Sequence, residues 1–90
     1  MRMLVVEDEA RIAADIAQSL GAAGYLAECA RDGEQAWFKG DTESYAAIVL
    51  DLGLPRLDGI TVLKRWRASG IKTPVLVLTA RGAWTERVEG

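Results

Sequence analysis

The sequence predicts an α/β fold of three layers, in which a parallel sheet is covered by helices on both faces. Short apolar segments alternate with amphipathic segments along the chain, which is the order expected of right-handed strand-helix-strand crossovers. The segment from Tyr45 to Leu50 is continuously apolar, as is typical of a strand buried on both faces. A chain of 90 residues closes around one core, so we expect a single domain over residues 1–90.

The first half of the chain predicts two strands and two helices. The first helix follows from Ile12, Ile16 and Leu20, which form an apolar stripe at helical spacing. Gly21 and Gly24 are placed to end it. The elements expected here are a strand from Met3 to Val6, a helix from Ala10, a strand from Tyr25 to Ala30 and a helix from Glu34 to Lys39, which stops near Gly40.

The second half continues the alternation. A turn-rich loop, Gly53 to Gly59, follows the buried strand, and Gly70 closes the next helix. Pro74 stands at the start of a strand, where its missing N–H is tolerated. The expected elements are the strand from Tyr45 to Leu50, a helix from Ile60 to about Ser69, a strand from Val75 to Leu78 and a last helix beginning near Ala83.

Composition excludes several classes of protein. The net charge is −2 and no run of Lys or Arg gathers on one face, so we expect no nucleic acid to bind this segment. No apolar run approaches the roughly 20 residues of a membrane-spanning helix, and we interpret the protein as cytoplasmic. Cys29 is the only cysteine and there is no histidine, which argues against an internal disulfide and against zinc.

Three predicted strands end in residues that carry chemistry: Glu7-Asp8, Asp51 and Thr79. An ionised carboxylate that ends a buried strand has a large desolvation cost unless a cation or hydrogen-bond donors meet it. Since the neighbouring carboxylates have the same sign, the group calls for a hard cation with oxygen ligands. We expect Mg²⁺, with Asp8 and Asp51 as direct ligands, Glu7 acting through water, and a loop carbonyl such as that of Gly53 completing the set.

Such a site favours phosphoryl transfer. With a cation neutralising charge on the phosphoryl oxygens, a free oxygen of Asp51 can attack phosphorus in line and form an acyl phosphate. Thr79 can donate its hydroxyl to a phosphoryl oxygen and so report phosphorylation.

Three motifs carry a family resemblance: VVEDE at 5–9, VLDLGLPRLDG at 49–59 and LTAR at 78–81. They strongly resemble the receiver domains of bacterial two-component response regulators, which are CheY-like, and especially the OmpR/PhoB subfamily. The resemblance implies a flavodoxin-like sheet of order 2-1-3-4, followed by a fifth strand. It also implies phosphoryl transfer from a sensor histidine kinase to Asp51, an acidic pair at Glu7 and Asp8, a metal-binding carbonyl at Gly53, and a switch hydroxyl at Thr79.

The chain departs from the family pattern at its end. Family members add a fifth strand bearing a Lys, an aromatic switch residue and a last helix, and the sequence stops at Gly90 before all three. We therefore expect a receiver that is incomplete at its C-terminus, with DNA binding and transcription regulation belonging to a domain outside these residues. Losing the last strand should bare the edge of the Val75 to Leu78 strand, and we expect a homodimer or a swapped or edge-paired oligomer.

Other interpretations compete with a signalling receiver, which would catalyse only its own phosphorylation and dephosphorylation. A small Mg²⁺-dependent aspartyl phosphotransferase or phosphatase would usually carry a second Asp two residues after the nucleophile, where this chain has Gly53. A signalling-dead receiver fragment is the third possibility. We interpret Asp58 as a helix N-cap outside the site, and Trp37, Phe38 and Trp66 as core or groove residues.

Overall fold

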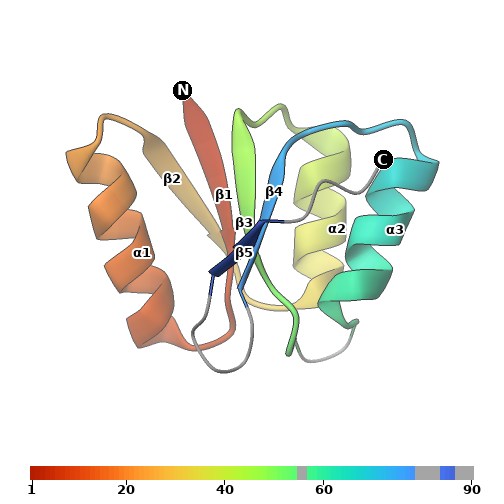
Figure 1. The fold of residues 1–90 in the computed structure, drawn as a ribbon, viewed down its shortest axis with the longest axis horizontal. Helices are drawn as coiled ribbons and strands as arrows, with labels where there is room; N and C mark the ends of the chain where they lie inside the picture. The colour runs from red at the N-terminus through yellow and green to blue at the C-terminus, as the bar shows by residue number, and fades with distance from the viewer. Residues whose placement is uncertain (55–56, 79–83, 87–90) are drawn as a thin grey trace.

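The computed structural model describes residues 1–54, 57–78 and 84–86. These residues form three layers, with α1 on one face of a central sheet and α2 and α3 on the other (Figure 1). The strands are β1 Arg2–Val6, β2 Leu26–Ala30, β3 Ala47–Asp51, β4 Val75–Leu78 and β5 Trp84–Glu86. The helices are α1 Ala10–Ala22, α2 Gly33–Thr42 and α3 Gly59–Ala68.

The sheet has the order β2-β1-β3-β4-β5, and its first four strands are parallel. This confirms the expected order 2-1-3-4 and the α/β class. The chain moves outward from β1 to β2 and then returns to the other side of β1 as β3. Strand order therefore reverses between β1 and β3, which is where open α/β sheets bind ligands at the carboxyl ends of the strands.

The end of the described chain differs from the sequence prediction. Residues 84–86 form β5, which pairs antiparallel with β4 and aligns Leu76 with Glu86 and Leu78 with Trp84. The prediction of a helix from about Ala83 is therefore wrong for these three residues, while Ala83 itself lies outside the described part. The unpaired backbone groups of β4 explain the difference, because a strand edge offers hydrogen bonds to any nearby extended segment. The edge that we expected to be bare is thus occupied.

Helix ends follow local chemistry. Asp32 caps α2 by accepting a hydrogen bond from the N–H of Gln35 at 2.8 Å. Gly24, at φ +93°, and Gly70, at φ +85°, end the turns after α1 and α3 in the left-handed region that favours glycine. Both glycines were expected to end helices, whereas Gly21 lies within α1.

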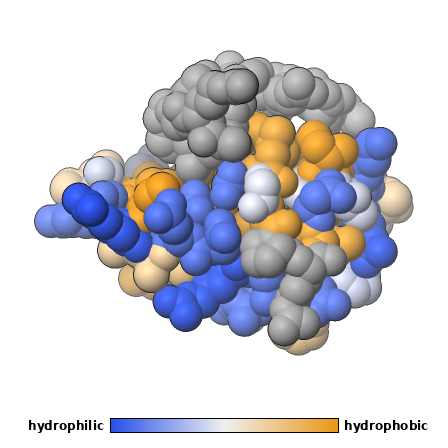
Figure 2. Space-filling model, turned by 90° about the horizontal axis from the view of Figure 1, so that it is seen from below, coloured by the Kyte–Doolittle hydropathy of each residue, from blue (hydrophilic) through white to orange (hydrophobic). Residues whose placement is uncertain are grey.

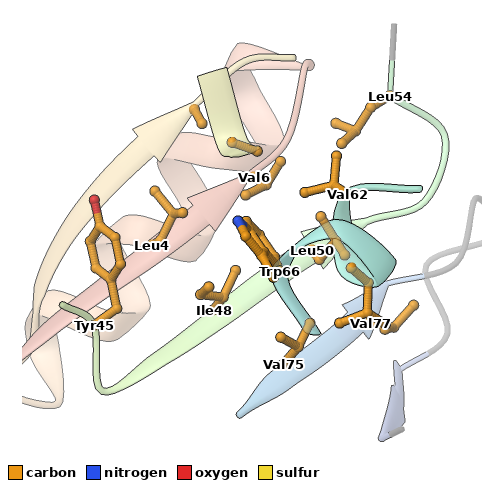
Figure 3. Packing of buried hydrophobic residues seen from close by; sticks show 13 residues of the cluster. Leu4, Val6, Tyr45, Ile48, Leu50, Leu54, Val62, Trp66, Val75 and Val77 are labelled. Atoms are coloured by element: carbon orange, nitrogen blue, oxygen red, sulfur yellow. The ribbon is translucent and has the colours of Figure 1, made fainter. Parts of the chain in front are cut away.

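The main core lies between the sheet and the α2–α3 layer. The indole of Trp66 is fully buried at its centre, among side chains of β1 and β3 (Figure 3). Gly40 lies in α2 directly beneath this indole, where any Cβ would overlap it, and the helix continues through it to Thr42 instead of ending there. Phe38 was expected in the core or in a groove, and at 66% exposed it is not in the core. Trp37 is 39% exposed, and the Arg65 guanidinium lies over its ring, 5.1 Å from the centroid.

Within the described ranges, none of the helices has the length and apolar character needed to span a bilayer.

Candidate metal and phosphoacceptor site

The expected acidic residues meet at the carboxyl ends of β1 and β3. These two strands are neighbours in register, with Val6 aligned with Leu50. Glu7 and Asp8 follow β1 directly, and Asp51 is the last residue of β3. One carboxylate oxygen from each of the three lies within 4.8 Å of the others. This end of the molecule has hydrophilic surface at its centre, beside an exposed hydrophobic area (Figure 2).

Asp51 is the most constrained of the three. It is 9% exposed, and its Oδ1 accepts a hydrogen bond from the N–H of Gly53 at 3.2 Å. That bond fixes the rotation of the carboxyl group and supplies one donor to its charge. Among the described residues, no hydrogen bond holds Oδ2. The protein therefore anchors Oδ1 through a backbone donor.

Glu7 is 5% exposed, and its Oε2 accepts a hydrogen bond from the N–H of Glu9 at 3.0 Å. Burial raises the pKa of Glu7 above its ordinary value, and the negative charge of Asp51 and the hydrogen bond with Asp8 raise it further. The backbone donor from Glu9 opposes this rise. Asp8 is exposed beside it, so the pair combines one buried and one solvent-facing carboxylate.

Two glycines in the β3–α3 loop have different roles. A Cβ added at Gly59 would lie 2.7 Å from the backbone oxygen of Asp51 and 2.9 Å from Cα of Leu52, so only glycine allows α3 to start this close to β3. The N–H of Gly59 also donates to the oxygen of Leu52 at 3.2 Å. A Cβ at Gly53 would lie 3.9 Å from Oδ1 of Asp51, which is ordinary contact. Gly59 was expected only to end the loop; the one local sign of its close approach to β3 is that a glycine stands directly after the helix cap Asp58.

The donor set fits a hard divalent cation. Three carboxylates with oxygens within 4.8 Å of one another repel, and an oxygen-ligated cation such as Mg²⁺ would relieve that repulsion. Asp58 does not join them: it caps α3, with Oδ1 accepting from the N–H of Thr61 at 2.9 Å, as the sequence predicted. Thr79 lies outside the described residues, so its role stays a prediction, as does the ligand role of the Gly53 carbonyl.

Residues 3–90 match the model of the response regulator receiver domain. The chain belongs to this family. The fold agrees with that membership. The resemblance implied a parallel sheet of order 2-1-3-4 with acidic residues at the strand ends, and the structure has both.

Curated relatives of this receiver include regulators of transcription. It is 38% identical over 90 residues to the two-component response regulator PhoP of Pseudomonas aeruginosa, an OmpR/PhoB-type regulator. It is 44% identical over 90 residues to the transcriptional regulatory protein TcrA of Mycobacterium tuberculosis. The match covers all of this chain but only 40% of PhoP and 36% of TcrA.

A similar solved structure is the response regulator protein TrrA of Thermotoga maritima. In complex with Mg²⁺ and BeF, TrrA is 32% identical and matches with a TM-score of 0.83 over 88% of this chain and 69% of its own. A second structure holds TrrA with the histidine kinase ThkA, and it matches with a TM-score of 0.83 and 29% identity over 96% of this chain and 74% of that one.

Proposed function

We propose that this receiver takes a phosphoryl group on Asp51 from a sensor histidine kinase, in a reaction that requires Mg²⁺. The observation that carries the proposal is the meeting of three carboxylates at the β1–β3 switch point, with Asp51 buried and held by one backbone donor. The complexes of TrrA with Mg²⁺ and BeF and with the kinase ThkA support it, since TrrA shares the fold and almost a third of its residues with this chain.

The chain supplies the nucleophile and its orientation. The Gly53 N–H holds Oδ1 of Asp51, which leaves Oδ2 to form the new bond to phosphorus. As that bond forms, the phosphorus–nitrogen bond of the phosphohistidine breaks, and the imidazole leaves with the electron pair. The product is an acyl phosphate on Asp51.

Asp8 and Asp51 would hold the metal directly, Glu7 through water, and the carbonyl of Gly53 would complete the set. When bound, Mg²⁺ supplies positive charge to the phosphoryl oxygens. Thr79 would donate its hydroxyl to one of those oxygens and transmit the phosphorylated state.

The relatives also support a proposal about what this receiver regulates. We propose that these 90 residues act as the receiver part of a cytoplasmic transcription regulator that binds DNA through another domain, since the match covers only 40% of PhoP and 36% of TcrA. On this proposal the receiver catalyses only its own phosphorylation and dephosphorylation. A metabolite phosphatase is disfavoured because Gly53 cannot act as the acid/base at the second position after Asp51.

The test is phosphorylation by acetyl phosphate, followed by intact mass. Wild type with Mg²⁺ should gain one phosphoryl group, and both Asp51→Asn and added EDTA should abolish the gain. Asp58→Asn is the matched control, since Asp58 lies a few residues away but caps α3, and it should be labelled like wild type. Labelling of Asp51→Asn, or labelling of wild type undiminished by EDTA, would refute the proposal.

A further inference from the structure

The β2 side of the sheet ends in an open edge. β2 lies first in the strand order and has β1 as its one neighbour among the described strands. The N–H of Leu26 donates to the oxygen of Met1, and the oxygen of Ala30 accepts from the N–H of Glu7, so the even-numbered residues of β2 face β1. Because alternate residues of a strand direct their backbone groups to opposite sides, Ala27 and Cys29 direct theirs away from the sheet.

This edge lacks the usual protection against pairing. Proteins guard edge strands with Lys, Pro, bulges or free charges, and residues 26–30 read Leu-Ala-Glu-Cys-Ala. The one charge, Glu28, is held in place: the guanidinium of Arg2 donates to it, Lys39 lies 3.7 Å away, and the Tyr45 hydroxyl donates to it at 3.0 Å. Within residues 26–30 the strand therefore presents backbone donors and acceptors, and its single charged side chain is held by partners.

Apolar side chains gather along the same edge. Leu26 is 64% exposed and Tyr25, just before the strand, is 37% exposed, and Cys29 is exposed as well. Exposed apolar groups beside unpaired backbone favour an added strand over water, because pairing satisfies the backbone and covers the side chains together.

We propose that this edge is an interface between two copies of the chain, in which the two β2 strands pair antiparallel about a two-fold axis at Ala27. In this register the two Ala27 residues exchange N–H···O=C bonds, and Tyr25 of each copy lies opposite Cys29 of the other. A large side chain then meets a small one, and aromatic–sulfur contact is favourable. Leu26 lies opposite Glu28 of the second copy, whereas an axis at Glu28 would set two carboxylates against each other.

The helices accommodate this pairing. α1 lies over β1 and β2. With neighbouring strands about 4.8 Å apart, the α1 helices of the two copies would lie about 10 Å apart, which is a normal helix-packing distance. The paired sheets would continue through the two-fold axis, and the acidic ends of both copies would stay open, so the interface is independent of the chemistry at Asp51.

Sedimentation velocity from micromolar to millimolar concentration tests the interface. Wild type should form dimers as concentration rises. Ala27→Pro should weaken association at least tenfold, since it removes an outward N–H and costs no bond to β1. The control is Phe38→Lys, which removes the exposed aromatic side chain of α2 and should leave the dimer intact. Wild type that stays monomeric, Ala27→Pro that associates like wild type, or dimers lost in Phe38→Lys would each overturn the proposal.

Folding and register need their own controls. Far-ultraviolet circular dichroism should show each variant folded, and if Ala27→Pro unfolds, Cys29→Lys tests the same edge at an exposed position. Opposed residues of an antiparallel pair lie close enough for a disulfide, so Tyr25→Cys should give a covalent dimer on oxidation. Wild type should not form a covalent dimer on oxidation, because in this register the Cys29 residues of the two copies are offset by four positions along the strands, or about 13 Å. A covalent dimer of wild type, or none for Tyr25→Cys, would overturn the register.

Discussion

Neutralising one carboxylate of the acidic cluster should stabilise the metal-free receiver. The three groups have oxygens within 4.8 Å of one another, and two unit charges at that distance repel by about 1 kcal/mol in a medium like water and about 3.5 kcal/mol at an effective dielectric constant of 20. Because Asp8 is exposed, the lower figure applies to its pairs. Asp8→Asn removes two pairs at the lower figure, so we expect a gain of about 1–2 kcal/mol. Asp51→Asn removes one such pair and also its pair with the buried Glu7, to which the higher figure applies, and it keeps an oxygen to accept from the Gly53 N–H, so we expect a gain of about 1–4 kcal/mol.

The assay is thermal unfolding at pH 8 in EDTA. For a domain of this size, 1 kcal/mol corresponds to roughly 4–8 °C in Tm. Asp51→Asn and Asp8→Asn should therefore both melt several degrees above wild type. Asp15→Asn is the matched control: Asp15 is exposed on α1, away from the cluster, and its loss should change stability by less than about 0.5 kcal/mol.

Magnesium should act in the opposite direction. Mg²⁺ stabilises the folded state by an amount that grows with the logarithm of its concentration over its Kd, so wild type should gain more in Tm than Asp51→Asn. A Tm lowered by both Asp51→Asn and Asp8→Asn in EDTA would refute the reasoning, since it would mean that these side chains hold the fold together rather than strain it.

Three further outcomes follow from the structure. Because the pKa of Glu7 is raised in the folded state, its ionisation opposes folding. The stability of metal-free wild type relative to Glu7→Gln should therefore be highest below about pH 4.5 and should fall as pH rises through the folded-state pKa. Urea unfolding measures this difference in stability, and a difference independent of pH would contradict the expectation. Gly59→Ala should lower the free energy of unfolding by about 1–3 kcal/mol because the added Cβ meets backbone, whereas Gly53→Ala should be tolerated. If urea unfolding showed that both variants lose the same free energy, this would be evidence against the close approach of α3 to β3. Trp66→Ala should cost about 3–5 kcal/mol, and a loss under about 1 kcal/mol would show that the indole is not the centre of the core.

Periodicity was enough to predict most of the fold. The strands and helices from β1 to β4 all occur where apolar spacing placed them, with ends shifted by a few residues. The larger errors come from contacts between distant segments. Gly40 was interpreted as a helix stop, yet α2 continues through it, and glycine is needed there because the Trp66 indole occupies the space that a side chain would fill. β5 replaced an expected helix because the edge of β4 offered backbone partners.

The site was predictable for a different reason. Glu7, Asp8 and Asp51 each stand directly at a strand end, and parallel topology brings those ends together, so local sequence sufficed to predict the acidic cluster. The network in which Arg2 joins Glu28 and Glu43 could not be predicted, because its members come from three segments with no shared motif. Such ion pairs depend on the tertiary fold.

The central claim is that Asp51 alone carries the phosphoryl group. Borohydride reduces an aspartyl phosphate to homoserine, so the acetylphosphate-treated receiver can be trapped with borohydride, digested and sequenced by mass spectrometry. Homoserine at position 51, present with Mg²⁺ and absent with EDTA, is the predicted result. Homoserine at position 8 or 58, reduction of Glu7 to 2-amino-5-hydroxypentanoic acid, or no homoserine in a chain that had gained phosphate would contradict the assignment.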